Sequence, residues 1–346
     1  MAHRHAIEFS AMPGVSVVAG VDIAPDRLAK FCDTYNIAGR FTDLDAAIEW
    51  GGFDAAVNLT PDAAHYATTM RLVETGKPIF CEKPLAPRYS QALEMTEAVE
   101  ARGIVNMVNL RYRGLAVMQK ARALVAEGAI GAVRHIDAAF LQSWLVGTHW
   151  GDWRTEERWL WRLSESHGSS GVLGDVGIHI LDFATFVTDR APLSVHCRLK
   201  TFDKAAGSRI GDYGLDANDS FVMSLEFEGG AIGTIHASRY ATGYANAQKV
   251  AIFGTEGSLE ITFESEVSSM RACLGPDVHT QTWRDVECPA VPSTYDTFAA
   301  AVRAGKSLDP TFRRAAELQR VIDLAFRSAK EERTLPVAEM PGGTLY

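Results

Sequence analysis

An aspartate and a histidine four residues apart are the first pair in this sequence that could do acid–base chemistry. They lie in residues 171–182, where a glycine-rich turn leads into a predicted helix, and Asp175 is the expected N-cap of that helix. Residues four apart share one face of a helix, so Asp175 and His179 can act on one group. A carboxylate and an imidazole suit the removal or return of an alcohol proton. A capping aspartate followed by a core histidine would show the same spacing.

A lysine that follows a predicted strand is the second candidate. Residues 79–81 are apolar, and Glu82-Lys83-Pro84 comes directly after them. Because Pro84 fixes the direction of the turn, the Lys83 ammonium is expected at the carboxyl edge of a sheet. The positive ring of an oxidised nicotinamide beside Lys83 would favour proton exchange. The alternative is an exposed lysine paired with Glu82.

An aspartate at the end of an earlier strand indicates a dinucleotide. Residues 15–21 predict a strand, and Asp22 follows it. In a dinucleotide-binding domain, an acid at the end of the second strand accepts hydrogen bonds from the adenosine ribose, and its charge disfavours a 2′-phosphate. Asp22 therefore indicates NAD, with NADP disfavoured, although an aspartate that merely caps the helix at 25–35 would look the same. The glycine fingerprint expected about 20 residues earlier is absent, so we expect the first strand and glycine loop to be missing.

Tryptophans are concentrated on the segment that leads to the glycine-rich turn. Five of the seven fall within residues 144–161. Rings with polar edges suit stacking on sugar faces, and an arginine among them can donate to hydroxyl or carboxylate groups. Aromatic packing of this segment onto the sheet or a second subunit would explain the same residues. The predicted substrate-binding residues are Trp150, Trp153, Arg154 and Trp161.

The first part of the chain must place Asp22 and Lys83. Short apolar runs alternate here with helical patterns, which predicts a parallel sheet wrapped by helices. Ligands of such sheets bind at the carboxyl ends of the strands, where both residues stand. The predicted strands are 15–21, 55–59, 79–81 and 104–109, and the predicted helices are 25–35, 61–74 and 89–102.

The character of the sequence changes after residue 112. Apolar and polar residues alternate at 221–227 and 231–239, and again at 249–253 and 258–263, which predicts hairpins of a largely antiparallel sheet. One face of such a sheet must be covered by a helix or by another subunit, so we expect a homodimer or homotetramer. A bridging helix over 113–128, a β-rich start at 133–144 and closing helices at 295–304 and 312–330 complete this part.

The fold class is therefore α/β plus α+β. A Rossmann-type domain over 1–112, with its first strand and glycine loop missing, should bind the dinucleotide. A domain over 113–346, with a large, mostly antiparallel open sheet, should bind the substrate and form the oligomer.

The composition limits the partners and the compartment. A net charge of −9 argues against nucleic acid, which favours a basic face. The five cysteines are scattered without a CxxC pair, which indicates reduced thiols and no metal framework. The chain has no secretory h-region and no run of about 18 apolar residues, so we expect a cytoplasmic protein without a membrane partner.

In this order, Asp22, Glu82-Lys83-Pro84 and Asp175-x-x-x-His179 resemble the glucose-fructose oxidoreductase/inositol dehydrogenase (Gfo/Idh/MocA) family, over essentially the whole chain. The resemblance implies that Lys83, Asp175 and His179 are the catalytic set. Residues 58–61 with His65 are similar to the family's loop over the cofactor. The implied cofactor-binding residues are Asp22, Asn58, Thr60, Pro61, His65, Glu82, Lys83, Asn109, Arg111 and Arg162.

Together these features predict an oxidoreductase that moves a hydride between NAD and a carbon of a sugar or polyol. His179 would take the hydroxyl proton while Lys83 hydrogen-bonds the same oxygen; the alternative is Lys83 as the base with His179 as the orienting group. Asp175 would orient the substrate through a neighbouring hydroxyl. Two alternatives are a non-catalytic regulator that senses NAD or sugar, and a redox-assisted glycosidase that uses NAD without net redox change.

Overall fold

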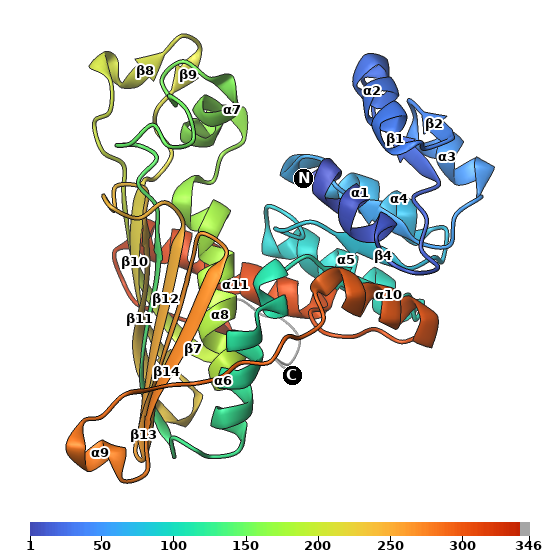
Figure 1. Ribbon diagram of the computed structural model, residues 1–346. Helices are drawn as coiled ribbons and strands as arrows, with labels where there is room; N and C mark the ends of the chain where they lie inside the picture. Colours follow the sequence, from blue (N-terminus) through green and yellow to red (C-terminus); the bar gives the residue numbers. More distant parts are fainter. Residues whose placement is uncertain (340–346) are drawn as a thin grey trace. The chain divides into compact units, whose positions relative to one another are not determined.

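The computed structural model describes residues 1–339 and divides into two compact units (Figure 1). The first unit contains Met1–Arg111 and Pro292–Ala316, and the second contains Tyr112–Val291 and the residues from Glu317 onward. Residues 292–316 thus differ from the predicted division, which put everything after 112 in the second domain. Tyr295 and Phe298 in this stretch pack into the apolar core of the first unit, which a boundary drawn along the sequence could not anticipate.

The first unit contains parallel strands in two sheets. Strands β1 (Ala19–Val21) and β2 (Gly39–Phe41) pair with each other, and β3 (Ala56–Asn58), β4 (Ile79–Cys81) and β5 (Asn106–Val108) form the second sheet in that order. The parallel, Rossmann-like character predicted from the alternating pattern is confirmed. The sequence analysis missed β2 and the short helix after it. The helices are α1 (Ala2–Ser10), α2 (Pro25–Tyr35), α3 (Leu44–Trp50), α4 (His65–Val73), α5 (Tyr89–Ala101) and α10 (Thr294–Ala304).

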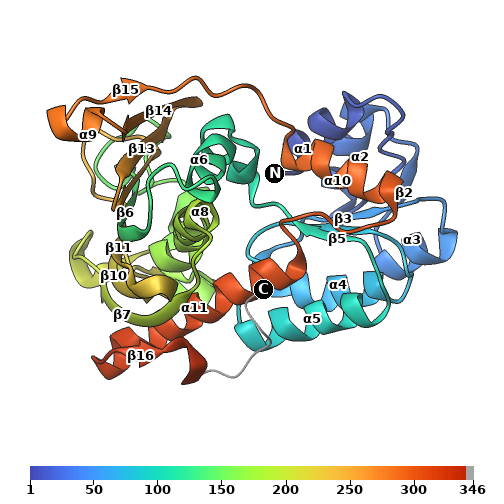
Figure 2. The ribbon, with the colours of Figure 1, turned by 90° about the horizontal axis from the view of Figure 1, so that it is seen from below.

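Successive residues of β4 point to opposite faces of its sheet and contact different helices. Phe80 packs with Tyr295 and Phe298 of α10, whereas Cys81 contacts Thr69 of α4. Figure 2 shows α4 and α5 on one face of this sheet and α10 on the other. Burial on both faces explains why the strand reads as an uninterrupted apolar run.

The second unit is built on a nine-stranded sheet in the order β15-β14-β13-β12-β6-β11-β10-β7-β16. Every neighbouring pair is antiparallel except β6 and β11. The two predicted hairpins are confirmed as β10–β11 and β12–β13. The strands are β6 (Val133–Leu141), β7 (Pro192–Lys200), β10 (Ser220–Phe227), β11 (Ile232–Ser238), β12 (Ala247–Gly254), β13 (Gly257–Glu264), β14 (Val267–Leu274), β15 (Arg284–Asp285) and β16 (Leu335–Pro336).

Helices cover one face of this sheet. Figures 1 and 2 show α6 (Ala116–Ala126) and α8 (Ile178–Thr188) on that face. Every residue of α8 is buried, which explains a helix that is apolar on nearly all sides. On the opposite face, Val222 and Ile232 are about half exposed, at 51% and 56%. The remaining helices are α7 (Glu157–Leu160), α9 (Asp277–Thr280) and α11 (Phe312–Glu331).

The tryptophan-rich segment forms an extension of the second unit with its own core. Trp144, Trp153, Leu163 and Leu215 are buried together there. Figure 1 shows the extension, with α7, β8 (Arg209–Ile210) and β9 (Tyr213–Gly214), beyond one end of the sheet. Among residues 1–339, no helix is both long enough and apolar enough to cross a membrane.

Candidate functional site

Asp22 directly follows β1 and is paired with an arginine. The guanidinium of Arg27, in the first turn of α2, donates to both carboxylate oxygens, and the backbone N–H of Ala24 donates to Oδ1 at 2.9 Å. These hydrogen bonds, that of Arg27 first, lower the pKa of Asp22, so the carboxylate is charged at neutral pH. The next residue, Ile23, is 87% exposed. The sequence analysis did not single out Arg27 or Ile23, although each is close to a residue that it did.

The loop after β3 is fixed by its own side chains. The amide of Asn58 donates to Thr68 Oγ1 at 2.7 Å and to Thr69 Oγ1 at 2.8 Å. Its Oδ1 accepts from the backbone N–H of Thr60 at 3.1 Å and from the hydroxyl at 2.8 Å. Asn58 is buried and its polar atoms form hydrogen bonds within the unit, so it holds this loop in place; its contact with a cofactor stays a prediction. Thr60 is half-buried and Pro61 is exposed.

Lys83 lies in a turn that buried groups hold from both sides. His65 is fully buried and donates from Nδ1 to the carbonyl oxygen of Pro84 at 2.7 Å, which holds the turn; its contact with a cofactor stays a prediction. The backbone N–H of Lys83 donates to Glu82 Oε2 at 3.2 Å. The Lys83 side chain itself is half-buried. The turn therefore presents a lysine at the carboxyl end of β4, as predicted.

Glu82 is the centre of a buried network. Its Oε1 lies 2.6 Å from His5 Nε2 and accepts from the Asn109 amide at 2.8 Å, while Asn109 Oδ1 accepts from the Thr294 hydroxyl at 2.8 Å. Burial alone would raise the pKa of Glu82, but the hydrogen bonds from His5 and Asn109 lower it to about 2. These groups join α1, β4, β5 and α10 and so hold the Lys83 turn. The cofactor contacts of Glu82 and Asn109 stay predictions.

Asp175 and His179 lie at the start of α8, but not as predicted. Asp175 is inside a π-helical turn, Leu173–Gly177, and the N-cap of α8 is Gly177. The predicted N-cap role of Asp175 is therefore wrong. Turns of this kind occur frequently at functional sites, and the four-residue spacing predicted only the proximity of the two side chains. Asp175 is 34% exposed, whereas the buried His179 ring meets Tyr112 edge to face, with 4.9 Å between ring centroids.

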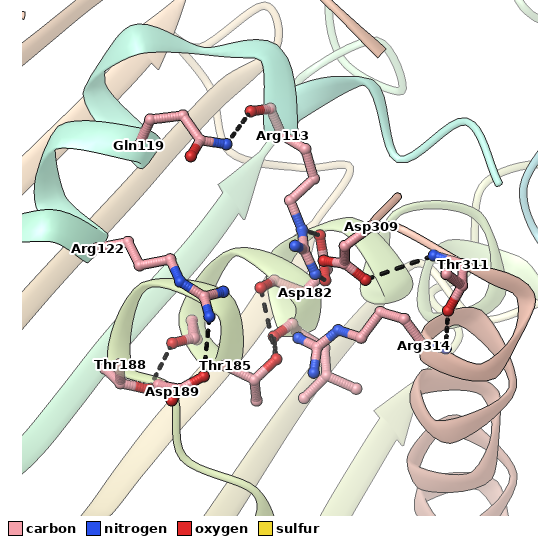
Figure 3. Close-up of polar contacts among 12 residues, drawn as sticks. Arg113, Gln119, Arg122, Asp182, Thr185, Thr188, Asp189, Asp309, Thr311 and Arg314 are labelled. Atoms are coloured by element: carbon pink, nitrogen blue, oxygen red, sulfur yellow. Dashed lines mark hydrogen bonds and ion pairs between the residues drawn. The ribbon is translucent and has the colours of Figure 1, made fainter. Parts of the chain in front are cut away.

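A buried ion pair fixes α8 one turn further on (Figure 3). Arg113 donates from Nε and Nη2 to the two carboxylate oxygens of Asp182, each at 2.7 Å. The guanidinium also lies over the ring of Phe186, 3.7 Å from its centroid. Figure 3 shows a second ion pair, at the C-terminal end of α8, in which Arg122 donates to Asp189. Since Asp182 follows His179 by three residues, the Arg113 pair restrains the rotation of the helix that carries the histidine.

The predicted substrate-binding residues differ in how deeply they are buried. Trp153 is 2% exposed, donates from Nε1 to the Leu145 carbonyl and belongs to the core of the extension, so its burial favours the packing alternative. Arg154 lies over the Trp153 ring. Trp150 is half-buried and stacked on Trp159. Trp161 is 37% exposed, with the guanidinium of Arg162 over its face. Arg111, another predicted cofactor residue, is half-buried.

Comparison with known proteins matches both parts of the chain to one family. Residues 1–110 match the description "Oxidoreductase family, NAD-binding Rossmann fold", and residues 118–260 match "GFO/IDH/MocA C-terminal domain". The chain is 25% identical to levoglucosan dehydrogenase of Pseudarthrobacter phenanthrenivorans, over 98% of this chain and 96% of the relative. It is also 25% identical to inositol 2-dehydrogenase of Rhizobium meliloti, over 96% and 95%.

A solved structure has the same fold. A levoglucosan dehydrogenase in complex with NADH and levoglucosan superposes with a TM-score of 0.84 at 24% identity, covering 97% of this chain and 96% of that one. At this identity the likeness supports the fold alone.

Proposed function

The chain belongs to the Gfo/Idh/MocA family of NAD-binding oxidoreductases, and from this we propose that it transfers a hydride between NAD and a hydroxyl-bearing carbon of a sugar or polyol. The names of two relatives, levoglucosan dehydrogenase and inositol 2-dehydrogenase, favour such a substrate. The observation that carries the proposal is Lys83 at the carboxyl end of β4, in a stretch that matches an NAD-binding Rossmann fold.

The residues present fit NAD. The charged Asp22 follows a strand end, where it would accept from the adenosine ribose, and the exposed Ile23 offers an apolar surface to the adenine. Thr60, Pro61 and Lys83 also follow strand ends and would complete the contacts on this unit. Arg111 and Arg162 are proposed as further contacts. Asn58, His65, Glu82 and Asn109 would act by holding these loops in place.

Bound NAD supplies the hydride acceptor, and the chain supplies the proton chemistry. His179 would take the proton from the substrate hydroxyl while the Lys83 ammonium donates a hydrogen bond to the same oxygen and stabilises its developing charge. The reversed assignment, with Lys83 as the base, uses the same two groups. Asp175 would accept a hydrogen bond from a neighbouring hydroxyl and so orient the sugar ring.

We further propose that the chain forms a homodimer or homotetramer through the outer face of the nine-stranded sheet, which is the face opposite α6 and α8. We also propose that it works in the cytoplasm. The half-exposed Val222 and Ile232 on that face support the first proposal. Five cysteines that form no disulfide suit a reducing compartment.

The experiment is a screen of sugars and polyols with NAD⁺, including levoglucosan and myo-inositol, in which NADH is followed by its absorbance. Formation of NADH with at least one member supports the proposal. Binding of NAD or sugar without NADH formation would instead indicate a regulator. Cleavage of a glycoside without net NADH would indicate the redox-assisted glycosidase.

A further inference from the structure

Arg239 is a fully buried cation next to the candidate catalytic aspartate. It follows β11, its side chain is 0% exposed, and its Nη2 donates to Asp175 Oδ2 at 3.3 Å. Its Nη1 donates to the carbonyl oxygen of Arg162 at 3.1 Å, and its guanidinium lies over the Trp144 ring. A charge removed from water is costly unless an anion is near it. Burial lowers the pKa of Arg239, and the charges of Asp175 and Asp219 oppose that effect.

A second buried pair lies near Arg239. Lys204 and Asp219 are both 0% exposed, and Lys204 Nζ lies 2.5 Å from Asp219 Oδ2. The carbonyl oxygen of Asp219 accepts from the backbone N–H of Arg239 at 3.0 Å. Because Lys204 already balances Asp219, Asp175 is the carboxylate that completes the neutralisation of this group of four charges.

The residue before Asp219 fixes the backbone that carries Asp175. Asn218 Oδ1 accepts from the Leu173 N–H at 3.0 Å, and its amide donates to the Ser170 carbonyl at 3.1 Å. Gly171 lies against it with φ +65, and a Cβ added there would meet the Asn218 amide at 2.2 Å. The two residues before β10 therefore have related roles. Asn218 holds the backbone of the π-helical turn by hydrogen bonds, and Asp219 belongs to the group of charges around Arg239.

The contact between Arg239 and Asp175 differs from the structural ion pair further along α8. Arg113 and Asp182 are both buried, and two hydrogen bonds of 2.7 Å join them. Asp175 makes a longer contact with its buried arginine while 34% of its side chain is exposed. A partly exposed carboxylate has several acceptor positions, so it can accept a hydrogen bond from a ligand while it remains paired with an arginine.

We propose that Arg239 is a positioning residue for Asp175, which holds the carboxylate in one orientation so that it accepts a hydrogen bond from a substrate hydroxyl. Arg239 does not touch the substrate, because it is fully buried. The inference rests on the proposed function for the role of Asp175. It adds a residue 64 positions away in sequence to the machinery of that site.

The contact is tested first by a measurement that does not depend on enzyme activity, a double-mutant cycle on urea unfolding. Arg239→Lys keeps the charge but not the planar guanidinium, and Asp175→Asn removes the charge that it balances. We expect Arg239→Lys to shift the unfolding midpoint less in the Asp175→Asn background than in the wild type. Equal shifts in both backgrounds would overturn the proposal.

The catalytic role is tested by the same cycle on the rate of NADH formation with a substrate found in the screen. Arg239→Lys should lower kcat about tenfold to a hundredfold, as expected for a displaced orienting group, and leave KM for NAD unchanged. In the Asp175→Asn background it should cause no further loss. The matched control is Arg320→Lys, which alters a buried arginine of α11 in the same unit that donates to the Val337 carbonyl, and which should keep the wild-type kcat.

A kcat for Arg239→Lys equal to that of the control would overturn the positioning role. If the wild type forms no NADH with any sugar or polyol, the proposed function fails and the catalytic role of Arg239 with it. The unfolding cycle then still decides whether the two residues are coupled.

Discussion

The guanidinium of Arg27 donates two parallel hydrogen bonds to the carboxylate of Asp22, from Nε to Oδ2 and from Nη2 to Oδ1, each 2.6 Å long. The pair stands at the end of β1, where the adenosine ribose of a dinucleotide is expected. We therefore expect Asp22 to act in two ways on the choice of cofactor: its charge would repel a 2′-phosphate, and it pairs with the arginine that could bind one.

Replacing Asp22 should shift cofactor use toward NADP. In Asp22→Ser the repulsion is lost and Arg27 is released to pair with the 2′-phosphate, so we expect the ratio of kcat/KM for NADP to that for NAD to rise at least about tenfold. Steady-state kinetics with both cofactors measure it. The double variant Asp22→Ser with Arg27→Ser should lose most of the gain, and an unchanged ratio in the single variant would contradict the assignment of Asp22.

Lys83→Met should abolish most of the turnover. Removing a group that hydrogen-bonds the reacting oxygen is expected to lower kcat by about 10² to 10⁴, with little change in NAD affinity measured by fluorescence titration. Lys306→Met, at an exposed lysine of the same unit, is the matched control and should retain the wild-type rate. Wild-type turnover in Lys83→Met would rule out both assignments of acid and base.

Glu82 should contribute stability that disappears in acid. Its pKa is lowered from 4.5 to about 2 in the folded protein, so the contribution is complete above about pH 5 and falls as pH drops toward 2. The shift corresponds to about 3 kcal/mol at neutral pH. We expect Glu82→Gln to reduce the free energy of unfolding by about that amount at pH 7 and by much less near pH 3.

Urea unfolding at several pH values measures this difference. Glu100→Gln serves as the control because the Glu100 side chain is half exposed in its pair with Arg313, and its effect should be small at every pH. If the difference in the free energy of unfolding between wild type and Glu82→Gln does not become smaller in acid, the charged carboxylate is not the form that stabilises the protein.

A buried and an exposed tryptophan of residues 144–161 should respond differently to truncation. Trp153→Ala removes a buried ring and should cost about 3–5 kcal/mol of stability. Trp161→Ala should leave the melting temperature nearly unchanged and raise KM for the sugar, because its ring is exposed and is a candidate for stacking on the sugar. Thermal unfolding and steady-state kinetics separate the effects. An unaltered KM in Trp161→Ala would remove that residue from the substrate site.

A charge on the outer face of the nine-stranded sheet should dissociate the oligomer. Ile232→Lys places an ammonium among exposed apolar residues of that face, where burial against a second subunit would be costly. Sedimentation analysis should show a dimer or tetramer for the wild type and a smaller species for the variant. Ile7→Lys, at an equally exposed isoleucine of α1, should not change the mass. A monomeric wild type would contradict the proposed assembly.

Local features of the sequence determined the fold class and where the reactive residues lie along the chain. Alternating apolar runs and helical patterns predicted β3, β4 and β5, because period and turn residues are set within a few positions. Lys83 could be placed at a strand end for the same reason. The hairpins β10–β11 and β12–β13 followed from strict alternation around glycine-containing turns.

Only the tertiary structure decided what each polar side chain does, because its partners come from distant parts of the chain. Asn109 joins Glu82 to Thr294, 185 residues away in sequence, and no local pattern indicates that contact. Arg239, which follows β11, reaches Asp175 in the π-helical turn, and Trp153 is buried although its neighbours in sequence are partly exposed. Burial and hydrogen-bond partners depend on which elements pack together. Composition and spacing therefore indicated which residues could react, and packing decided which of these are buried and hydrogen-bonded and which are exposed.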